Sequence, residues 1–286
     1  MAGHDPGRAT ALLALTILSS PSRAELYAAA LVVPAINVLA LRMELLVRTT
    51  GWVESFLNLF GISAIVWFAL YALIRLGVDA RRGSRPRGLD WLACAVSLIL
   101  SLIPTQGPPL VALVALGTYL FVTAADRDER AVAIVGLALT GPLLWGPLLL
   151  RLLGDDMLSF DAAVAAFLSG NTSLGNLVVT PGPAPDVLIL PGCSALRNVA
   201  PVFVLAAALS QLTGMAPNRR LAVACLVAVV AVIATNSVRL ALIATYPQHY
   251  TYLHEGGGAT LFSYANMLVV VAIISAAIVR DRRHAV

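Results

Sequence analysis

Eight apolar runs, separated by short polar connections, dominate this chain of 286 residues. A membrane-spanning helix needs about 20 predominantly apolar residues, and most of the runs approach that length. The pattern therefore predicts an all-α polytopic membrane protein, a bundle of about eight transmembrane helices. Because the third and sixth runs are short, a bundle of six spans stays open. The runs cover approximately residues 24–41, 59–76, 90–104, 108–125, 131–153, 198–213, 221–246 and 260–279.

The composition excludes a soluble domain of this size. Apolar residues make up 59% of the chain and charged residues 12%, and the mean hydropathy is +0.87. A soluble domain needs a far more polar surface. Because no polar domain, low-complexity tract or internal repeat interrupts the runs, we expect residues 1–286 to form a single membrane domain.

The arginines predict the orientation of the spans, since basic residues collect in cytoplasmic loops. The chain has no lysine, and with both termini in the cytoplasm 14 of its 19 arginines lie on the cytoplasmic side. We therefore expect a multi-pass protein of the cell membrane. Because these arginines sit in short loops between apolar runs, they favour orientation over nucleic-acid binding. The other side holds Arg42, Arg48, Arg151, Arg197 and Arg239.

The first 20 residues allow two interpretations. Arg8 precedes an apolar stretch at 10–17, which is typical of a signal peptide. That stretch is too short to span, and a longer apolar run follows at once. We expect an uncleaved cytoplasmic start that leads into the first span.

The longest non-cytoplasmic segment covers about residues 154–193. Its stretch 160–168 is typical of an interfacial amphipathic helix. Two strand-like pieces follow at 176–180 and 186–190, with proline and glycine between them at 181–185. This pattern predicts a small extracytoplasmic hairpin-like loop, although an ordinary connecting loop stays open.

Cys193 follows the hairpin, in a turn that we expect at the outer surface. A cysteine where a helix begins has its thiolate favoured by exposed N–H groups and the helix dipole, and Ser194 could cap the same turn. The alternative is a structural cysteine. Cys94 and Cys225 lie inside apolar runs, where cysteine is usually a small hydrophobe. The three cysteines have no metal-ligand spacing, so we expect neither a metal nor a cofactor.

Asn236 and Arg239 are three residues apart in the seventh run and share one helical face. An arginine inside a span costs roughly 2.5–3.5 kcal/mol on insertion scales, so it normally faces the protein interior and has a partner. The alternative is that Arg239 extends its side chain to the outer headgroups.

His254 precedes three glycines, Gly256, Gly257 and Gly258, in the outer loop before the last span. Consecutive glycines let the backbone approach another group closely or bend sharply. A lone loop histidine is otherwise usually just solvated, as we expect for His249.

The predicted topology brings Cys193, Arg239 and His254 to one face of the membrane. A thiolate needs a base to form and an acid to protonate the leaving amine, and histidine can supply both. The tetrahedral intermediate needs a fixed positive donor, which arginine provides. Together the three residues are a complete set for acyl transfer through a thioester.

These residues resemble the exosortase/archaeosortase family of polytopic membrane cysteine transpeptidases. The resemblance rests on three segments, in the same order and spacing as in the family, and is strongest over residues 150–280. They are Cys193-Ser194-Ala195-Leu196-Arg197, Asn236-x-x-Arg239 and His254-x-x-x-Gly258. Ala195 stands where the family usually has glycine.

The resemblance implies a catalytic Cys193, Arg239 and His254, with Ser194, Arg197, Asn236 and Gly258 in support. It implies a thiol protease or transpeptidase whose partners are exported proteins with C-terminal tripartite sorting tails: a short motif, a membrane span and a basic cluster. Cleavage at the extracytoplasmic face would be followed by hydrolysis or by transfer to an acceptor.

Three other functions stay open on the sequence. A transporter or channel could use Asn236 and Arg239 to line a polar path. A membrane acyltransferase could use the same cysteine–histidine chemistry on another acyl donor. A non-enzymatic assembly scaffold is the third. The sequence does not determine the tail motif, the acceptor or the oligomeric state.

Overall fold

Every apolar run contains a helix in the computed structural model, which describes residues 21–80, 83–182 and 185–284. The expected cytoplasmic start at residues 1–20 lies outside this range. Shorter helices flank the main ones: α3 (Trp52–Leu57), η1 (Leu59–Gly61), α9 (Gly154–Ser169), η4 (Pro247–His249) and α12 (Tyr250–His254). The helices of the apolar runs are α2 (Arg23–Thr50), α4 (Ala64–Asp79), α5 (Gly88–Ser101), α6 (Gly107–Thr123), α7 (Arg127–Thr140) with η2 (Gly141–Trp145) and α8 (Gly146–Leu152), α10 (Leu196–Leu212), α11 (Arg219–Thr245) and α13 (Gly257–His284).

Four helices in the described part of the chain are long and apolar enough to cross a membrane. They are Arg23–Thr50, Arg127–Leu152, Arg219–Thr245 and Gly257–Asp281. The apolar helices α5, α6 and α10 have 14 to 17 residues, and at 1.5 Å per residue they reach roughly 21–26 Å, less than a hydrocarbon core of about 30 Å. A mostly helical, membrane-embedded protein is therefore confirmed, whereas the count of about eight spans stays a prediction.

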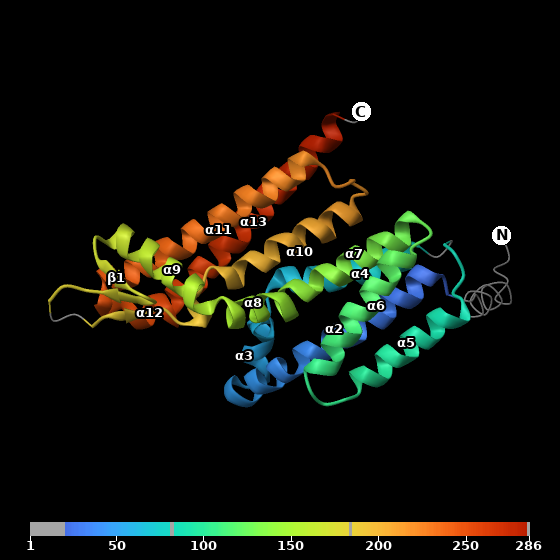
Figure 1. Cartoon of the computed structure of the whole chain (residues 1–286), viewed down its shortest axis with the longest axis horizontal. Coiled ribbons are helices and arrows are strands. Elements are labelled where there is room, and N and C mark those ends of the chain that lie inside the picture. The colour runs from blue at the N-terminus through green and yellow to red at the C-terminus, as the bar shows by residue number, and fades with distance from the viewer. Residues whose placement is uncertain (1–20, 81–82, 183–184, 285–286) are drawn as a thin grey trace, which may run out of the picture.

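The helices pack as two groups that α10 joins (Figure 1). One group contains α2, α4, α5, α6 and α7, and the other contains α11 and α13 side by side; α10 contacts α4 and α7 on one side and α11 and α13 on the other. The main apolar core runs through both groups. A second, smaller core lies where α9 packs on α11, and it includes Leu158, Val178, Ile189 and Leu240.

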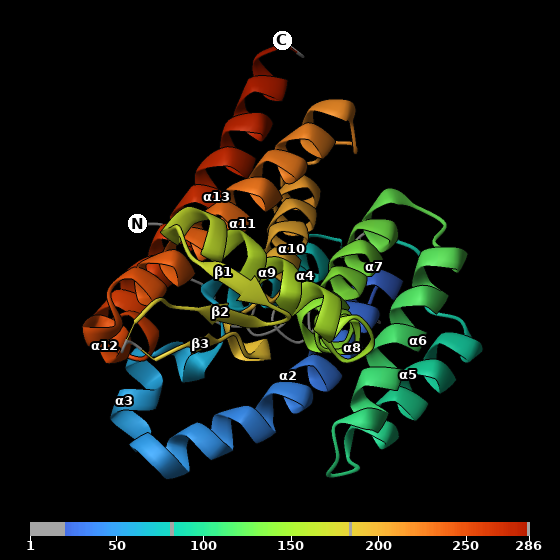
Figure 2. The same ribbon diagram turned by 60° about the vertical axis from the view of Figure 1, so that its left-hand side comes forward.

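A three-stranded antiparallel sheet lies against α9 (Figure 2). Its strands are β1 (Thr172–Leu174), β2 (Leu177–Val179) and β3 (Val187–Leu188), with Thr172 opposite Val179 and Val178 opposite Val187. The two pieces predicted at 176–180 and 186–190 contain β2 and β3. Strand β1 was not predicted. It joins β2 through a two-residue turn in which Gly175 adopts a φ of +56°, a conformation that favours glycine. The sheet leads directly into the segment that holds Cys193.

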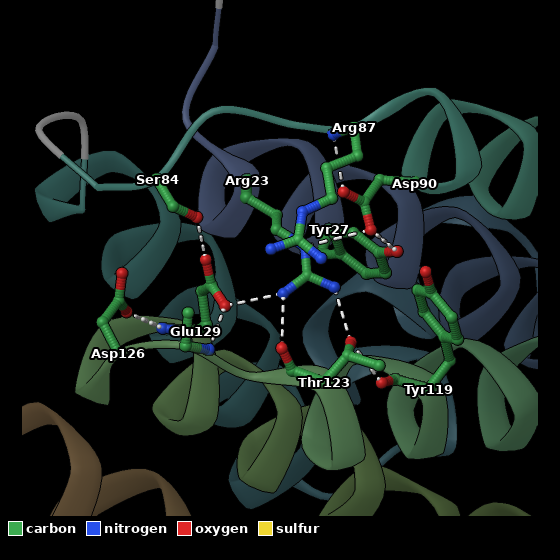
Figure 3. Close-up of polar contacts among 10 residues, drawn as sticks. Arg23, Tyr27, Ser84, Arg87, Asp90, Tyr119, Thr123, Asp126 and Glu129 are labelled. Atoms are coloured by element: carbon green, nitrogen blue, oxygen red, sulfur yellow. Dashed lines mark hydrogen bonds and ion pairs between the residues drawn. The ribbon is translucent and has the colours of Figure 1, made fainter.

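A buried ion-pair cluster ties together α2, α5, α6 and α7 at one end of the bundle (Figure 3). Arg23 is 5% exposed; its Nε donates to Asp90 at 3.0 Å and its Nη1 to Glu129 at 2.7 Å. Tyr27 donates to the same Asp90 oxygen, and Thr123 accepts from the guanidinium. Breaking such a buried pair by removing one partner is strongly destabilising. The predicted orientation included Arg23 among the cytoplasmic arginines. In the structure, Asp90 and Glu129 neutralise the charge of Arg23 inside the protein.

Candidate active site

Cys193 ends the 3₁₀ turn η3 (Pro191–Cys193), between β3 and α10. Its N–H donates to the Leu190 carbonyl at 2.8 Å, which fixes the turn. Its side chain is 7% exposed and belongs to the second core, beside Ile189, Leu240 and Ile243. The sequence predicted a surface turn. Pro191 and Gly192 of the turn are exposed, but the prediction is wrong for the Cys193 side chain, which packs into the apolar core that α9 and the sheet share with α11.

His254 lies against Cys193, although 61 residues separate them in the sequence. The Sγ of Cys193 is 3.1 Å from Nε2 of His254, the last residue of α12. The imidazole stacks on Tyr250 with ring centroids 4.9 Å apart. Its Nδ1 is buried without a hydrogen bond, 3.5 Å from the Glu255 carboxylate. With Nε2 unprotonated, His254 is placed to take the thiol proton.

The glycines after His254 let α13 begin close to α12. A Cβ at Gly258 would lie 2.9 Å from both the carbonyl oxygen and a ring carbon of Tyr252, closer than real Cβ atoms come. A Cβ at Gly256 would lie 3.1 Å from the same carbonyl oxygen. Glycine is therefore required at 258 to keep the first turn of α13 against the helix that carries His254.

Helix α11 brings two polar side chains to Cys193. Asn236 is 3% exposed, and its Nδ2 donates to the carbonyl oxygen of Cys193 at 2.9 Å. Arg239, one turn further along, is half-buried and interacts electrostatically with the Cys193 thiol. Its Nε is buried and has no hydrogen-bond partner among the described residues. Arg239 thus combines an unused donor with a charge that acts on Cys193.

Asp161 of α9 holds the two residues that follow Cys193. Its Oδ2 accepts from the N–H of Ala195 at 3.2 Å, and its carboxylate hydrogen-bonds the Ser194 side chain. The side chains of Asp161 and Ser194 are each 2% exposed. Burial raises the pKa of Asp161, and the two hydrogen bonds act in the opposite direction. The sequence placed Asp161 only within a predicted interfacial helix, and its one signal was a lone carboxylate in an apolar stretch.

Ala195 fits the turn in which the family resemblance expects glycine. Its φ of −57° and ψ of −32° are open to any residue, and it is the N-cap of α10. Ser194 does not cap α10 as its N-cap residue, but its Oγ accepts from the N–H of Leu196 at 3.3 Å. The loss of glycine therefore causes no backbone strain here.

Arg197 is the predicted supporting residue without a hydrogen bond to the candidate catalytic residues, although its Nη1 would lie 3.9 Å from a Cβ at Gly192, in the cysteine turn. It is exposed at the start of α10, and within the described chain it makes no hydrogen bond to Cys193, Arg239 or His254. Its charge interacts with that of Arg42 on α2. Both arginines belong to the smaller group that the orientation analysis placed on the non-cytoplasmic side.

The grouping of cysteine, histidine, arginine and asparagine is suited to nucleophilic acyl transfer. Cys94 and Cys225 are free thiols on α5 and α11 and take no part in it. Across residues 21–80, 83–182 and 185–284, no three histidine, cysteine, aspartate or glutamate side chains gather in a way that could hold a metal ion. Comparison of the chain with family models, curated proteins and solved structures finds no match.

Proposed function

We propose that this protein is a membrane-embedded cysteine peptidase or transpeptidase that cleaves the C-terminal sorting tails of exported proteins at the extracytoplasmic face. The observation that carries the proposal is the 3.1 Å contact between Cys193 Sγ and His254 Nε2. A structural cysteine has no need of a histidine at this distance. The order of the three motifs, which resembles the exosortase/archaeosortase family, adds the substrate class.

The reaction begins when His254 takes the proton of Cys193 and the thiolate attacks the carbonyl carbon of the scissile peptide bond. The carbonyl π electrons move to oxygen, and Arg239 donates to the resulting oxyanion. Collapse of the intermediate breaks the C–N bond, and protonated His254 gives its proton to the leaving amine. The product is a thioester on Cys193, which water or an acceptor amine or hydroxyl then attacks, with His254 again taking the proton.

The site is held so that this chemistry can occur without rearrangement of the nucleophile. Asn236 fixes the carbonyl of Cys193, and Asp161 fixes the residues that follow it. Catalytic groups that are pre-positioned in a desolvated site need little reorganisation in the transition state. The same contact weighs against a transporter path lined by Asn236, since its amide is engaged by the backbone of the cysteine turn.

A trapped thioester tests the proposal. A tagged substrate with a short motif, ~20 apolar residues and an arginine-rich end is co-expressed with the full chain. Mass spectrometry of the Cys193 peptide should show the substrate fragment attached, and hydroxylamine should release it. The Cys225→Ala variant, which alters a cysteine outside the site, should accumulate the same adduct. A cleaved tail with no adduct on Cys193 in any preparation, or an adduct on Cys225, would contradict the mechanism.

A further inference from the structure

An apolar groove lies between α11 and α13. Its lining residues belong to the start of α11 and the end of α13, and Figure 1 shows that this end of the helix pair is the one nearest the C-terminus, opposite to α12. The volume of the groove is approximately 520 Å³. Val223 and Val227 of α11 form one wall, and Ile273 and Ala276 of α13 form the other. Val223 and Val227 are 50% and 49% exposed, so the protein leaves half of these apolar side chains uncovered.

Two arginines close the polar end of the groove. Arg220 comes from the start of α11 and Arg280 from near the end of α13, and both line the same cavity. The apolar spans of these helices are Arg219–Thr245 and Gly257–Asp281, so both arginines lie at a span boundary. The groove therefore runs from the headgroup level into the hydrocarbon region.

We infer that this groove binds one anionic phospholipid, with its phosphate between Arg220 and Arg280 and an acyl chain along the valine wall. Guanidinium groups bind phosphate through paired hydrogen bonds, and basic pockets between membrane helices bind lipid headgroups. A further protein helix fits the site less well, because it would bury two arginines without an anion.

One carboxylate lies close to the two arginines. Asp281 is 3.8 Å from Arg220 Nη1, and its Oδ1 also accepts from Asn218 at 2.9 Å. The long distance to Arg220 leaves the guanidinium donors available, and Arg280 makes no ion pair with another described residue. Two guanidinium groups against one carboxylate leave the end of the groove with a positive balance, which matches a phosphodiester.

Lipid titration of the purified full chain, followed by native mass spectrometry, tests this site. Phosphatidylglycerol should bind more tightly than phosphatidylcholine with the same acyl chains. At about 1 kcal/mol for each arginine, Arg220→Gln or Arg280→Gln should weaken phosphatidylglycerol about fivefold, and the double variant about 25-fold. Arg219→Gln is the matched control, because Arg219 carries the same charge in the same turn but does not line the groove. It should bind nearly as the unmodified chain does.

The part of the groove that is proposed to hold the acyl chain is tested separately. Ala276→Phe places a ring in the groove and should displace the lipid, whereas Ala272→Phe, also exposed and one turn away, should not. Equal binding of the two lipids, or equal losses from Arg219→Gln and Arg220→Gln, would overturn the site. Displacement of phosphatidylglycerol by inorganic phosphate alone would overturn the lipid as its occupant.

Discussion

The side-chain amide of Asn236 donates a hydrogen bond to the backbone carbonyl oxygen of Cys193 at 2.9 Å, and both residues are buried. This bond joins helix α11 to the turn that carries the candidate nucleophile. Arg239 follows one turn later on the same helix, and its charge interacts with Cys193. A single helix therefore carries both the amide that holds the cysteine backbone and the charge that acts on the thiol.

Asn236→Asp should slow tail processing while the protein still accumulates. The variant has nearly the same shape, but it leaves the buried carbonyl of Cys193 without a donor, which costs about 1–3 kcal/mol, or roughly 5- to 150-fold. Its negative charge also opposes a thiolate. Asn37→Asp is the control, since Asn37 donates to the backbone carbonyl of Ser101. Processing rates in membranes should separate the two; similar rates would remove Asn236 from the site.

Arg239→Lys should be nearly as damaging as Arg239→Ala. A guanidinium presents a planar fork of donors, whereas an ammonium is a point charge on a flexible stem that loses its proton more readily when buried. Losing one well-placed oxyanion donor costs about 2.7–4 kcal/mol, or two to three orders of magnitude in rate. Arg151→Lys, an exposed arginine of α8, should have little effect. Near-normal processing by Arg239→Lys would instead mean that Arg239 only extends to the headgroups.

Asp161 gives stability a defined pH dependence. Burial raises its pKa, so the folded chain binds this proton more tightly than the unfolded chain does. The resulting stabilisation is complete below the unfolded pKa of about 3.9 and is lost as the pH rises through the folded pKa. The melting temperature of the unmodified chain should therefore fall relative to that of Asp161→Asn as the pH rises above about 4. Asp156→Asn, an exposed change on the same helix, should show no such trend. A melting temperature of the unmodified chain that rises relative to that of Asp161→Asn over this range would contradict a raised pKa of Asp161.

Gly258→Ala should lower both stability and the reactivity of Cys193. The added Cβ would lie 2.9 Å from the Tyr252 carbonyl oxygen, so α12 or α13 must shift, at a cost of roughly 1–3 kcal/mol. A shift of α12 moves His254 away from the sulfur, which should slow alkylation of Cys193 by iodoacetamide. Gly154→Ala is the control, because its Cβ would meet nothing within 4 Å. Equal melting temperatures and alkylation rates in the two variants would show that the close contact is unimportant.

Hydrophobicity alone predicted where the helices lie, because an apolar run of this length has no other way to satisfy its backbone in a membrane. It did not predict how far each helix spans. Helix α5, for example, ends at Ser101, although its run continues to residue 104. Where a helix ends depends on local capping and on the helices packed around it, which hydrophobicity does not report.

The chemistry-bearing residues were visible in the sequence, and so were the supporting residues Asn236 and Gly258, but the support that Asp161 gives was not. The three candidate catalytic residues are polar or reactive groups in unusual places, so each could be identified from the sequence alone. They are Cys193, Arg239 and His254. Asp161 acts through a contact with Ala195, 34 residues away, and nothing local indicates that pairing. The burial of Cys193 likewise depends on α9 and the sheet folding over it, which requires knowledge of tertiary packing.

Conversion of a tailed substrate by Cys193→Ala, at matched abundance in membranes, tests the central claim most directly. The substitution removes only a sulfur from a small apolar contact, so the variant should accumulate as the unmodified chain does. Because no other group in the site can form the thioester, the variant should leave the substrate uncleaved, and Cys193→Ser should leave at most a trace of activity. Cleavage by Cys193→Ala at the rate of the unmodified chain would contradict the account of this protein as a cysteine enzyme.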